Sequence, residues 1–451
     1  MHRASEVVEL GSESSRELGG IGAQGRQGFD GGKGGAGGVD LFDEAVAEEQ
    51  EAAAVLTAAE VDQYRVIDTD THVIEPYDLW TSRLPARWRD QAPHVKWDEN
   101  RQEDAWFFGT ERIGAAASAA QAGWREYPPD HPPRLADVDT ATWDAKARLA
   151  RMDTYGVWAQ VLYPNVAGFG AGKLLTLGDS DLMLACVRAY NDFLVEYASA
   201  DPRRFIPVMA LPMWDMELCE KEIVRAASAG HKGVIMTGEP TYWGLPPIAE
   251  SYWDRLWALC QEMELPVNFH IGSGDMSIFD HASPSAGPHA NYAGFGLQFG
   301  LANARVIANL ITGGVCHRFP GTRFVSVESG VGWIPFALEH LDWQWLNCGV
   351  QHEHPEYDLL PSEYFKRQMF GCFWFERASV RSAIDQLGPD WILYESDFPH
   401  PTSMAPGPAT AAVEPREYIA AELGDLAPDV LRKILHDNAA ALYQLEPLGS
   451  E

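Results

Sequence analysis

Residues 65–72 read RVIDTDTH, a short apolar start followed by alternating acidic, hydroxyl and imidazole side chains. Because successive side chains of a strand point to opposite faces, Asp68, Asp70 and His72 lie on the same face. Three potential metal ligands at the end of a strand are typical of a sheet whose chemistry lies at the carboxyl ends of its strands. We therefore predict that this segment is the first strand of a parallel sheet.

The rest of the chain repeats the pattern of an apolar run followed by a helical segment. Further apolar runs lie at 159–164, 204–212, 232–238, 265–272, 322–329, 368–375 and 390–397. Strands that alternate with amphipathic helices indicate βαβ units, and eight units predict an α/β fold, a (β/α)8 TIM barrel. A doubly wound open sheet would need a glycine-rich phosphate turn after the first strand, where this chain has THVIEP (71–76).

Two segments lie outside this pattern. Residues 1–60 are Gly-rich and then Ala/Glu-rich, which predicts a disordered or peripheral tail before a catalytic domain at 61–451. Residues 77–150 form an insertion after the first strand that is too long for an ordinary βα loop, and we predict a lid. Its many aromatic residues fit either a bulky apolar substrate or attachment of the insertion to the barrel.

Charge and cysteine content exclude several classes of protein. The 34 Lys and Arg residues face 65 Asp and Glu residues, a net charge of −31, which argues against binding nucleic acid or anionic membranes. The six cysteines are isolated from one another, which predicts reduced, buried thiols. The sequence has neither a long apolar run nor a secretory signal pattern, so we expect a cytoplasmic protein. A homo-oligomer is compatible with the sequence, which indicates no seam.

Potential ligands also end three later strands. His270 follows the fifth apolar run, Glu328 ends the sixth, and Asp397 and His400 end the eighth. Each alone has an ordinary explanation, since a single His is often a hydrogen-bonded structural residue and an Asp can start a turn. Together they favour a metal site above the barrel. His317 and Glu239 are predicted to have structural roles in turns.

Five segments together resemble an amidohydrolase-related family of TIM-barrel enzymes, which includes aminocarboxymuconate-semialdehyde and dihydroxybenzoate decarboxylases. They are DTDTHVIEP (68–76), FHIG (269–272), GGVCHRFP (313–320), ESGVGWIP (328–335) and SDFPH (396–400). The resemblance implies one divalent metal held by Asp70, His72, His270 and Asp397.

Glu328 departs from the family, whose decarboxylases and hydrolases have a His on the sixth strand. A carboxyl group can replace imidazole near neutral pH only if its pKa is strongly raised, whereas a carboxylate readily binds a second cation. Six predicted ligands would suffice for two metals: Asp70, His72, His270, Glu328, Asp397 and His400. These types suit non-haem iron but also accept Mn or Zn. Glu75 is predicted as a further ligand or as a residue that holds one.

Within the family, the D-x-D-x-H-x-x-E-P start is similar to the non-haem diiron monooxygenases of platensimycin and platencin diterpenoid biosynthesis. This resemblance implies two irons, O2, an electron donor and hydroxylation of a bulky apolar substrate linked to coenzyme A, with Asp397 and Glu328 as catalytic residues. Basic residues of the insertion could meet the carrier's phosphates or be plain solvated charges: Arg83, Arg87, Arg89, Lys96 and Arg101. The alternative is a hydrolase or decarboxylase with one Zn or Mn, acting on a carboxylic acid or its ester or thioester; in a hydrolase Asp397 would activate metal-bound water.

Overall fold

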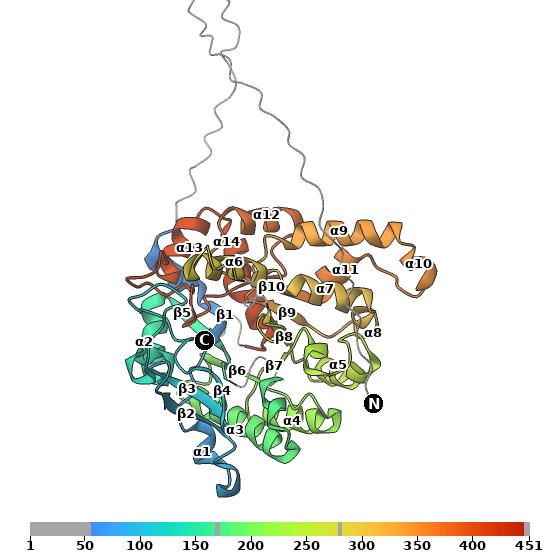
Figure 1. Ribbon diagram of the computed structural model, residues 1–451. Coiled ribbons are helices and arrows are strands. Elements are labelled where there is room, and N and C mark those ends of the chain that lie inside the picture. Colours follow the sequence, from blue (N-terminus) through green and yellow to red (C-terminus); the bar gives the residue numbers. More distant parts are fainter. Residues whose placement is uncertain (1–55, 167–171, 278–281, 446–451) are drawn as a thin grey trace, which may run out of the picture. The chain divides into compact units, whose positions relative to one another are not determined.

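The computed structural model describes residues 56–166, 172–277 and 282–445 (Figure 1). By its internal contacts the chain divides into Met1–Ala52 and Ala53–Glu451. Most of the predicted tail therefore lies outside the described residues, and its disorder stays a prediction. The described part begins just before a 3-10 helix, η1 (Ala58–Tyr64), and leads directly into the first strand.

Eight parallel strands form the barrel, so the predicted fold is confirmed (Figure 1). In sheet order they are β1 (Val66–His72), β5 (Val157–Tyr163), β6 (Phe205–Met209), β7 (Gly233–Met236), β8 (Val267–His270), β9 (Phe324–Val327), β10 (Met369–Phe373) and β11 (Ile392–Tyr394). The last strand returns to the first: the His72 backbone N–H donates to the Phe398 carbonyl at 2.7 Å, and that of Asp397 to the Asp70 carbonyl at 3.0 Å. This closure brings the carboxyl ends of β1 and β11 together.

Helices cover the outside of the barrel and provide the second layer of its core. The longer ones are α2 (Ala145–Tyr155), α3 (Ser180–Ala198), α4 (Met216–Ala229), α5 (Asp254–Glu262), α6 (Pro288–Gly300), α7 (Asn303–Thr312), α9 (Ile334–Asn347), α11 (Pro361–Gln368), α12 (Ala378–Leu387) and α13 (Pro415–Leu423). Short ones are α1 (Leu79–Arg83), α8 (Val315–Arg318), α10 (Val350–Glu353), α14 (Pro428–Arg432) and α15 (Asn438–Leu442). β7 alternates as a buried strand should, because Val234 and Met236 join one apolar cluster and Ile235 joins the other.

The insertion at 77–150 contains a small antiparallel sheet that the sequence did not lead us to predict. Its strands are β2 (Pro93–Asp98), β3 (Glu103–Phe108) and β4 (Glu111–Ala115), paired in the order β2-β3-β4. The sheet is linked to the barrel through α1: Trp106 packs on Trp80 with ring centroids 5.5 Å apart, and the Trp80 indole N–H donates to the Cys186 carbonyl on α3 at 3.1 Å. Trp80 and Trp106 therefore serve attachment, the second of the two roles expected for these aromatics.

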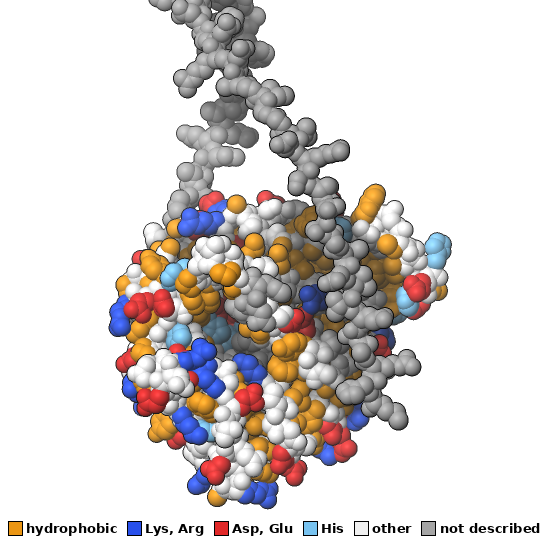
Figure 2. All heavy atoms as spheres, viewed as in Figure 1, with side chains coloured by type: hydrophobic (Ala, Val, Ile, Leu, Met, Phe, Trp, Pro, Cys, Tyr) orange, Lys and Arg blue, Asp and Glu red, His pale blue; other side chains and the backbone are white. Residues whose placement is uncertain are grey.

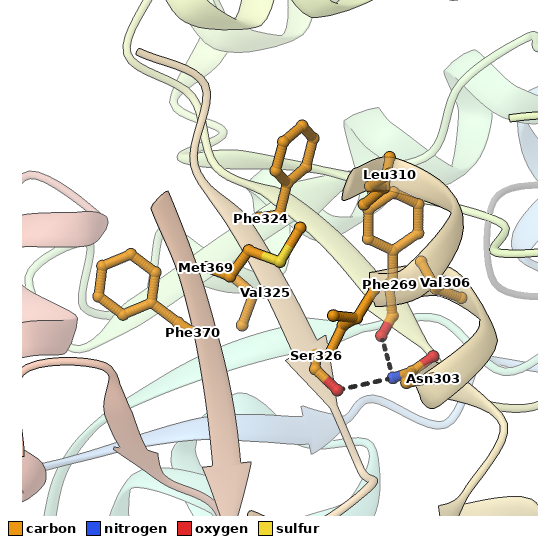
Figure 3. Close-up of a pocket in the computed structure, with 10 residues that line it drawn as sticks. Phe269, Asn303, Val306, Leu310, Phe324, Val325, Ser326, Met369 and Phe370 are labelled. Atoms are coloured by element: carbon orange, nitrogen blue, oxygen red, sulfur yellow. Dashed lines mark hydrogen bonds between the residues drawn. The ribbon is translucent and has the colours of Figure 1, made fainter. Parts of the chain in front are cut away.

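Asn303 on α7 fixes two of the strands that carry predicted ligands. Its amide nitrogen donates to the Phe269 carbonyl at 2.9 Å and to the Ser326 hydroxyl at 3.1 Å (Figure 3). It also reaches the Val327 carbonyl at 3.2 Å. The next residues along the chain are His270 and Glu328, so one buried amide sets where β8 and β9 end. The cavity drawn in Figure 3 has a volume of about 10 Å³, room for about one water.

The prediction of reduced, buried cysteines is confirmed only in part. Five cysteines are buried and all six are free thiols, but Cys348, at the end of α9, is exposed, so that part of the cysteine prediction is wrong. It follows a helix that also exposes Phe336, Trp343 and Leu346, which an isolated cysteine in the sequence does not reveal. Among the described residues, the longest apolar helical stretch falls short of what crossing a bilayer requires.

Candidate metal centre

The structure brings the six predicted ligands together at the carboxyl ends of the barrel strands. Three overlapping groups have ligand atoms within 4.8 Å of one another: Asp70, His72 and His270; His72, Asp397 and His400; and Asp70, Glu328 and Asp397. All but Glu328 and His400 are fully buried or nearly so. Residues from four strands thus converge on one small volume, as the strand-end pattern predicted.

Asp70 lies at the middle of this cluster. Its Oδ1 is 3.4 Å from Nε2 of His72 and 3.3 Å from Nε2 of His270, and these two nitrogens are 3.1 Å apart. Neither carboxylate oxygen of Asp70 has a hydrogen bond of good geometry to the described residues. A buried carboxylate in this state costs free energy unless a positive charge lies beside it.

The tautomers of the two histidines follow from their other partners. Nδ1 of His72 lies 2.9 Å from the Pro164 carbonyl, and Nδ1 of His270 lies 2.8 Å from the Ile271 carbonyl. A carbonyl only accepts, so both Nδ1 atoms carry protons and both rings direct Nε2 toward Asp70. Two such nitrogens 3.1 Å apart beside a carboxylate need a shared positive charge, which either a proton or a cation supplies.

The distances fit a cation. Nitrogen and oxygen ligands about 2.0–2.2 Å from a zinc-like ion lie roughly 3.0–3.5 Å from one another at right or tetrahedral angles. The separations among Asp70, His72 and His270 are 3.1 to 3.4 Å, and Asp397 Oδ1 is 3.5 Å from Nε2 of His72. The donor set and its spacing therefore suit one divalent ion.

The backbone at the two catalytic candidates is strained. Asp397 has φ = 59° and Glu328 has φ = 56°, the left-handed region that residues other than glycine rarely adopt. Glu376 stabilises the turn after Glu328, because its carboxylate accepts the backbone N–H groups of Val331 at 2.9 Å and Gly332 at 2.7 Å. Strain retained by surrounding contacts is common at functional sites.

Burial and charge set the protonation of this cluster. The pKa of Glu328 is raised well above its usual range by burial and by the Asp397 carboxylate, with which it shares a hydrogen bond. Burial disfavours the charged form of His270, but the carboxylates of Asp70 and Glu328 outweigh it and raise the pKa of His270 to about 9. The condition that would let a carboxyl group replace the family's imidazole is thus met at Glu328.

Glu75 and His400, whose roles the sequence left open, are linked by Asn165. Glu75 accepts the backbone N–H groups of Asn165 at 2.8 Å and Val166 at 2.9 Å. His400 contacts Asn165 through Nε2 at 2.6 Å and lies 3.0 Å from Asp397 Oδ1 through Nδ1. Glu75 therefore lies outside the three ligand groups, whereas His400 belongs to one of them.

Sequence reasoning named Asp68 only as a potential metal ligand and did not single out Arg148, but both residues hold the ligands in place. Asp68 accepts the Ser396 backbone N–H at 2.8 Å and its hydroxyl at 2.5 Å, which ties β1 to β11 beside Asp397. Arg148, fully buried on α2, donates to the His72 carbonyl at 2.6 Å and to the Gln160 side chain at 3.1 Å. The alternation of Asp68 with two ligands along β1 could have indicated its role near them. No pattern in the sequence around Arg148 indicates its contacts.

Other predicted positions lie away from the centre. His317, on α8, contacts the Tyr364 hydroxyl at 3.2 Å, and Glu239 forms an ion pair with Arg305 before a 3-10 turn, η6 (Pro240–Trp243). Both have the structural contacts that we predicted. A second cavity of about 520 Å³ lies at the opposite, amino ends of the strands, lined by residues such as Leu265 and Arg323.

Three of the basic residues of the insertion have partners within the protein. Arg83 forms an ion pair with Glu196, Arg87 stacks over Trp88, and Lys96 lies over Phe107. Basic and acidic side chains are interspersed on the face drawn in Figure 2. These contacts correspond to solvated surface charges, the second of the two interpretations above.

Comparison with known proteins gives a consistent set of relatives. The family model described as Amidohydrolase matches residues 67–445. The γ-resorcylate decarboxylase of Polaromonas sp. is 26% identical over 282 residues, which cover 59% of this chain and 78% of that protein. Among solved structures, the amidohydrolase map2389c of Mycobacterium avium subsp. paratuberculosis has a TM-score of 0.66 at 22% identity, covering 84% of this chain and 99% of that one. A Polaromonas sp. dihydroxybenzoic acid decarboxylase, with bound manganese and the inhibitor 2-nitroresorcinol, has a TM-score of 0.52 at 18% identity, covering 84% and 96%.

The prediction that this protein is a diiron monooxygenase is wrong, because these findings contradict it. The named curated relative is a decarboxylase, and the metal named with the solved decarboxylase is manganese. The error came from treating Glu328 as a ligand of a second iron. The ligand types alone do not decide the reaction, because the same carboxylates and imidazoles also suit Mn or Zn. The same resemblance implied two irons, O2, an electron donor and a diterpenoid substrate linked to coenzyme A. These predictions lose their support together with the monooxygenase.

Proposed function

Since the chain belongs to the amidohydrolase family, we propose that it is a metal-dependent decarboxylase of a small carboxylic acid. The observation that carries this proposal is the convergence of Asp70, His72 and His270, whose facing ligand atoms lie 3.1 to 3.4 Å apart. The relatives named as decarboxylases make hydroxylated benzoic acids the first substrate class to test.

One divalent ion, Mn or Zn, would be held by Asp70, His72, His270 and Asp397. When bound, it supplies Lewis-acid stabilisation of the negative charge that develops on the substrate's oxygens. Arg148 and Asn303 fix the backbone carbonyls next to these ligands. The protein thereby keeps the ligand atoms in place before any substrate arrives, which lowers the cost of reorganisation.

Glu328 supplies the proton in this mechanism. When the bond between the substrate carbon and its carboxylate breaks, the electron pair stays on that carbon and CO2 leaves. The carbon then takes the proton from the Glu328 carboxyl group, which shares its hydrogen bond with Asp397. Water later returns a proton to this pair. Burial keeps the proton on Glu328 in the resting enzyme, and a nearby cation brings its pKa back toward neutrality, where proton transfer is efficient.

The insertion at 77–150 and α6 would cover the centre. The backbone N–H groups of Gln121 and Ala122 donate to the Pro399 carbonyl at 2.9 and 3.1 Å, which brings the insertion next to Asp397 and His400. From α6, the Tyr292 phenol has a raised pKa because of burial and the charges of Glu328 and Asp397. Two segments far apart in sequence would thus exclude water, which favours proton transfer to carbon.

The direct test is metal content together with CO2 release. The purified full-length protein is expected to hold close to one Mn or Zn per chain by elemental analysis and to release CO2 from a hydroxylated benzoic acid such as γ-resorcylate. A chelator should stop the release and added Mn²⁺ should restore it. Cleavage of esters without CO2 would indicate the hydrolase instead, and two irons per chain would contradict the single-ion assignment.

Metal affinity should depend on pH through His270. The pKa of about 9 exceeds the ordinary 6.5, so below pH 9 a proton must leave before its Nε2 can bind a cation. Mn²⁺ affinity is therefore expected to rise about tenfold per pH unit between about pH 7 and 9 and then to level off. Competition with a chelator at several pH values measures this. A His270→Gln variant should bind more weakly with a flatter profile, and a flat wild-type profile would contradict the assignment.

A further inference from the structure

The ring of His400 is held on three sides. Its face stacks on His72, with ring centroids 3.6 Å apart and an interplanar angle of 16°. Nε2 lies 2.6 Å from Asn165 Oδ1, and Nδ1 lies 3.0 Å from Asp397 Oδ1. A ring with this many contacts keeps one orientation. The groups that face its two nitrogens therefore determine which nitrogen carries the proton.

Asn165 presents an acceptor to Nε2. An amide could present its NH2 group instead, but here that group donates to the Val73 carbonyl at 3.0 Å and lies 3.5 Å from Glu75 Oε2. Both of these oxygens only accept, so a flipped amide would place oxygen against oxygen. Oδ1 must therefore face His400, and a neutral His400 carries its proton on Nε2.

Glu75 keeps Asn165 in this position. It is buried, and Oε1 accepts the backbone N–H groups of Asn165 and Val166 just after β5. Because the carboxylate lies in the loop that follows β1, it joins the ends of two neighbouring strands. Glu75 thus acts on His400 only through Asn165.

With the proton on Nε2, the Nδ1 atom of His400 has a lone pair directed into the ligand cluster. Asp397 Oδ1 accepts no hydrogen bond from the described residues, although Nδ1 is 3.0 Å away. Nδ1 of His400 and Oδ1 of Asp397, 3.0 Å apart, have the spacing of neighbouring ligands on one ion. The same arrangement would be unfavourable without a positive charge between them.

We propose that Glu75 and Asn165 set the tautomer of His400 so that its Nδ1 is a direct ligand of the cation, with Glu75 and Asn165 as positioning residues. This inference rests on the metal centre of the proposed function, and it extends the ligand set beyond the four residues that the family resemblance implies.

Mn²⁺ affinity of the full-length chain, measured by competition with a chelator, tests the proposal. His400→Ala and Asn165→Leu are each expected to weaken binding about 10- to 100-fold, the usual effect of losing a ligand or the partner that orients it. Asn191→Leu is the matched control, because Asn191 is a buried amide that bonds Ala210 and Glu222 away from the centre.

A spectroscopic measurement separates ligation from loss of stability. In Co²⁺-loaded protein the visible absorption bands should change in the His400 and Asn165→Leu variants and stay unchanged in Asn191→Leu, even if all three melt at lower temperature. Unchanged Mn²⁺ affinity and spectrum in His400→Ala would overturn this proposal alone. A wild-type chain that binds neither Mn²⁺ nor Zn²⁺ would overturn the proposed function, and this inference with it.

Discussion

Asp70→Asn is expected to remove the metal and to lower decarboxylation by about three orders of magnitude or more. Asp70 is fully buried and lies 3.3 to 3.4 Å from two imidazole nitrogens. The amide keeps the size of the side chain but loses the negative charge that binds the cation. A bound cation supplies several kcal/mol of transition-state stabilisation, which corresponds to a factor of that size in rate. Elemental analysis after dialysis measures the loss of metal. The rate of CO2 release measures the loss of activity.

Asp62→Asn is the matched control for this variant. Asp62 undergoes the same chemical change, but its side chain is 58% exposed and its partner is Arg416 at 3.7 Å, away from the centre. It should keep its metal and its rate. Full metal content in Asp70→Asn would show that the cation is bound elsewhere, and the assignment of the centre would then fail.

Glu328→Gln is expected to separate proton transfer from metal binding. Glutamine has the shape of glutamate but no acidic proton to give, so kcat should fall by about 10²- to 10⁴-fold, the usual contribution of a general acid. KM and Mn content should change little, since the four proposed ligands remain. Steady-state kinetics with metal analysis of the same sample measures both.

Replacing Glu328 by histidine provides a second test of its role as proton donor. The family resemblance implies a His on the sixth strand, so Glu328→His should recover part of the activity that Glu328→Gln loses. Its pH profile should shift, because imidazole has an ordinary pKa near 6.5, unlike the raised pKa of the buried carboxyl group. If Glu328→Gln loses its metal together with its activity, Glu328 is a ligand rather than the proton donor.

The barrel and the positions of the candidate ligands were predictable because both follow from local rules. Alternation along β1 puts Asp70 and His72 on one face, and the carboxyl ends of parallel strands meet at one end of a barrel. The insertion was different. Its length was evident, but the β2-β3-β4 sheet was not predicted, since short antiparallel strands depend on tertiary packing, here of Trp106 on Trp80 of α1.

The reaction was less predictable than the site. The sequence gives Glu328 as an acid at a strand end, and that acid is compatible with binding a second metal or with carrying a proton. The difference lies in its pKa, which depends on partial burial beside the Asp397 carboxyl group. These two residues are 69 positions apart in the chain, and no local pattern reports how close their carboxyl groups come.

By itself, the sequence determined a barrel with acids and imidazoles at the ends of β1, β8, β9 and β11, because periodicity and strand order are properties of the chain. Only the tertiary structure decided which of these groups share a charge and which hold the others in place. Asn165 and Arg148 illustrate this, since their roles come from contacts with His400 and the His72 carbonyl. Hydrogen-bond geometry and desolvation act through space, over distances of about 3 Å that closure of the barrel alone creates.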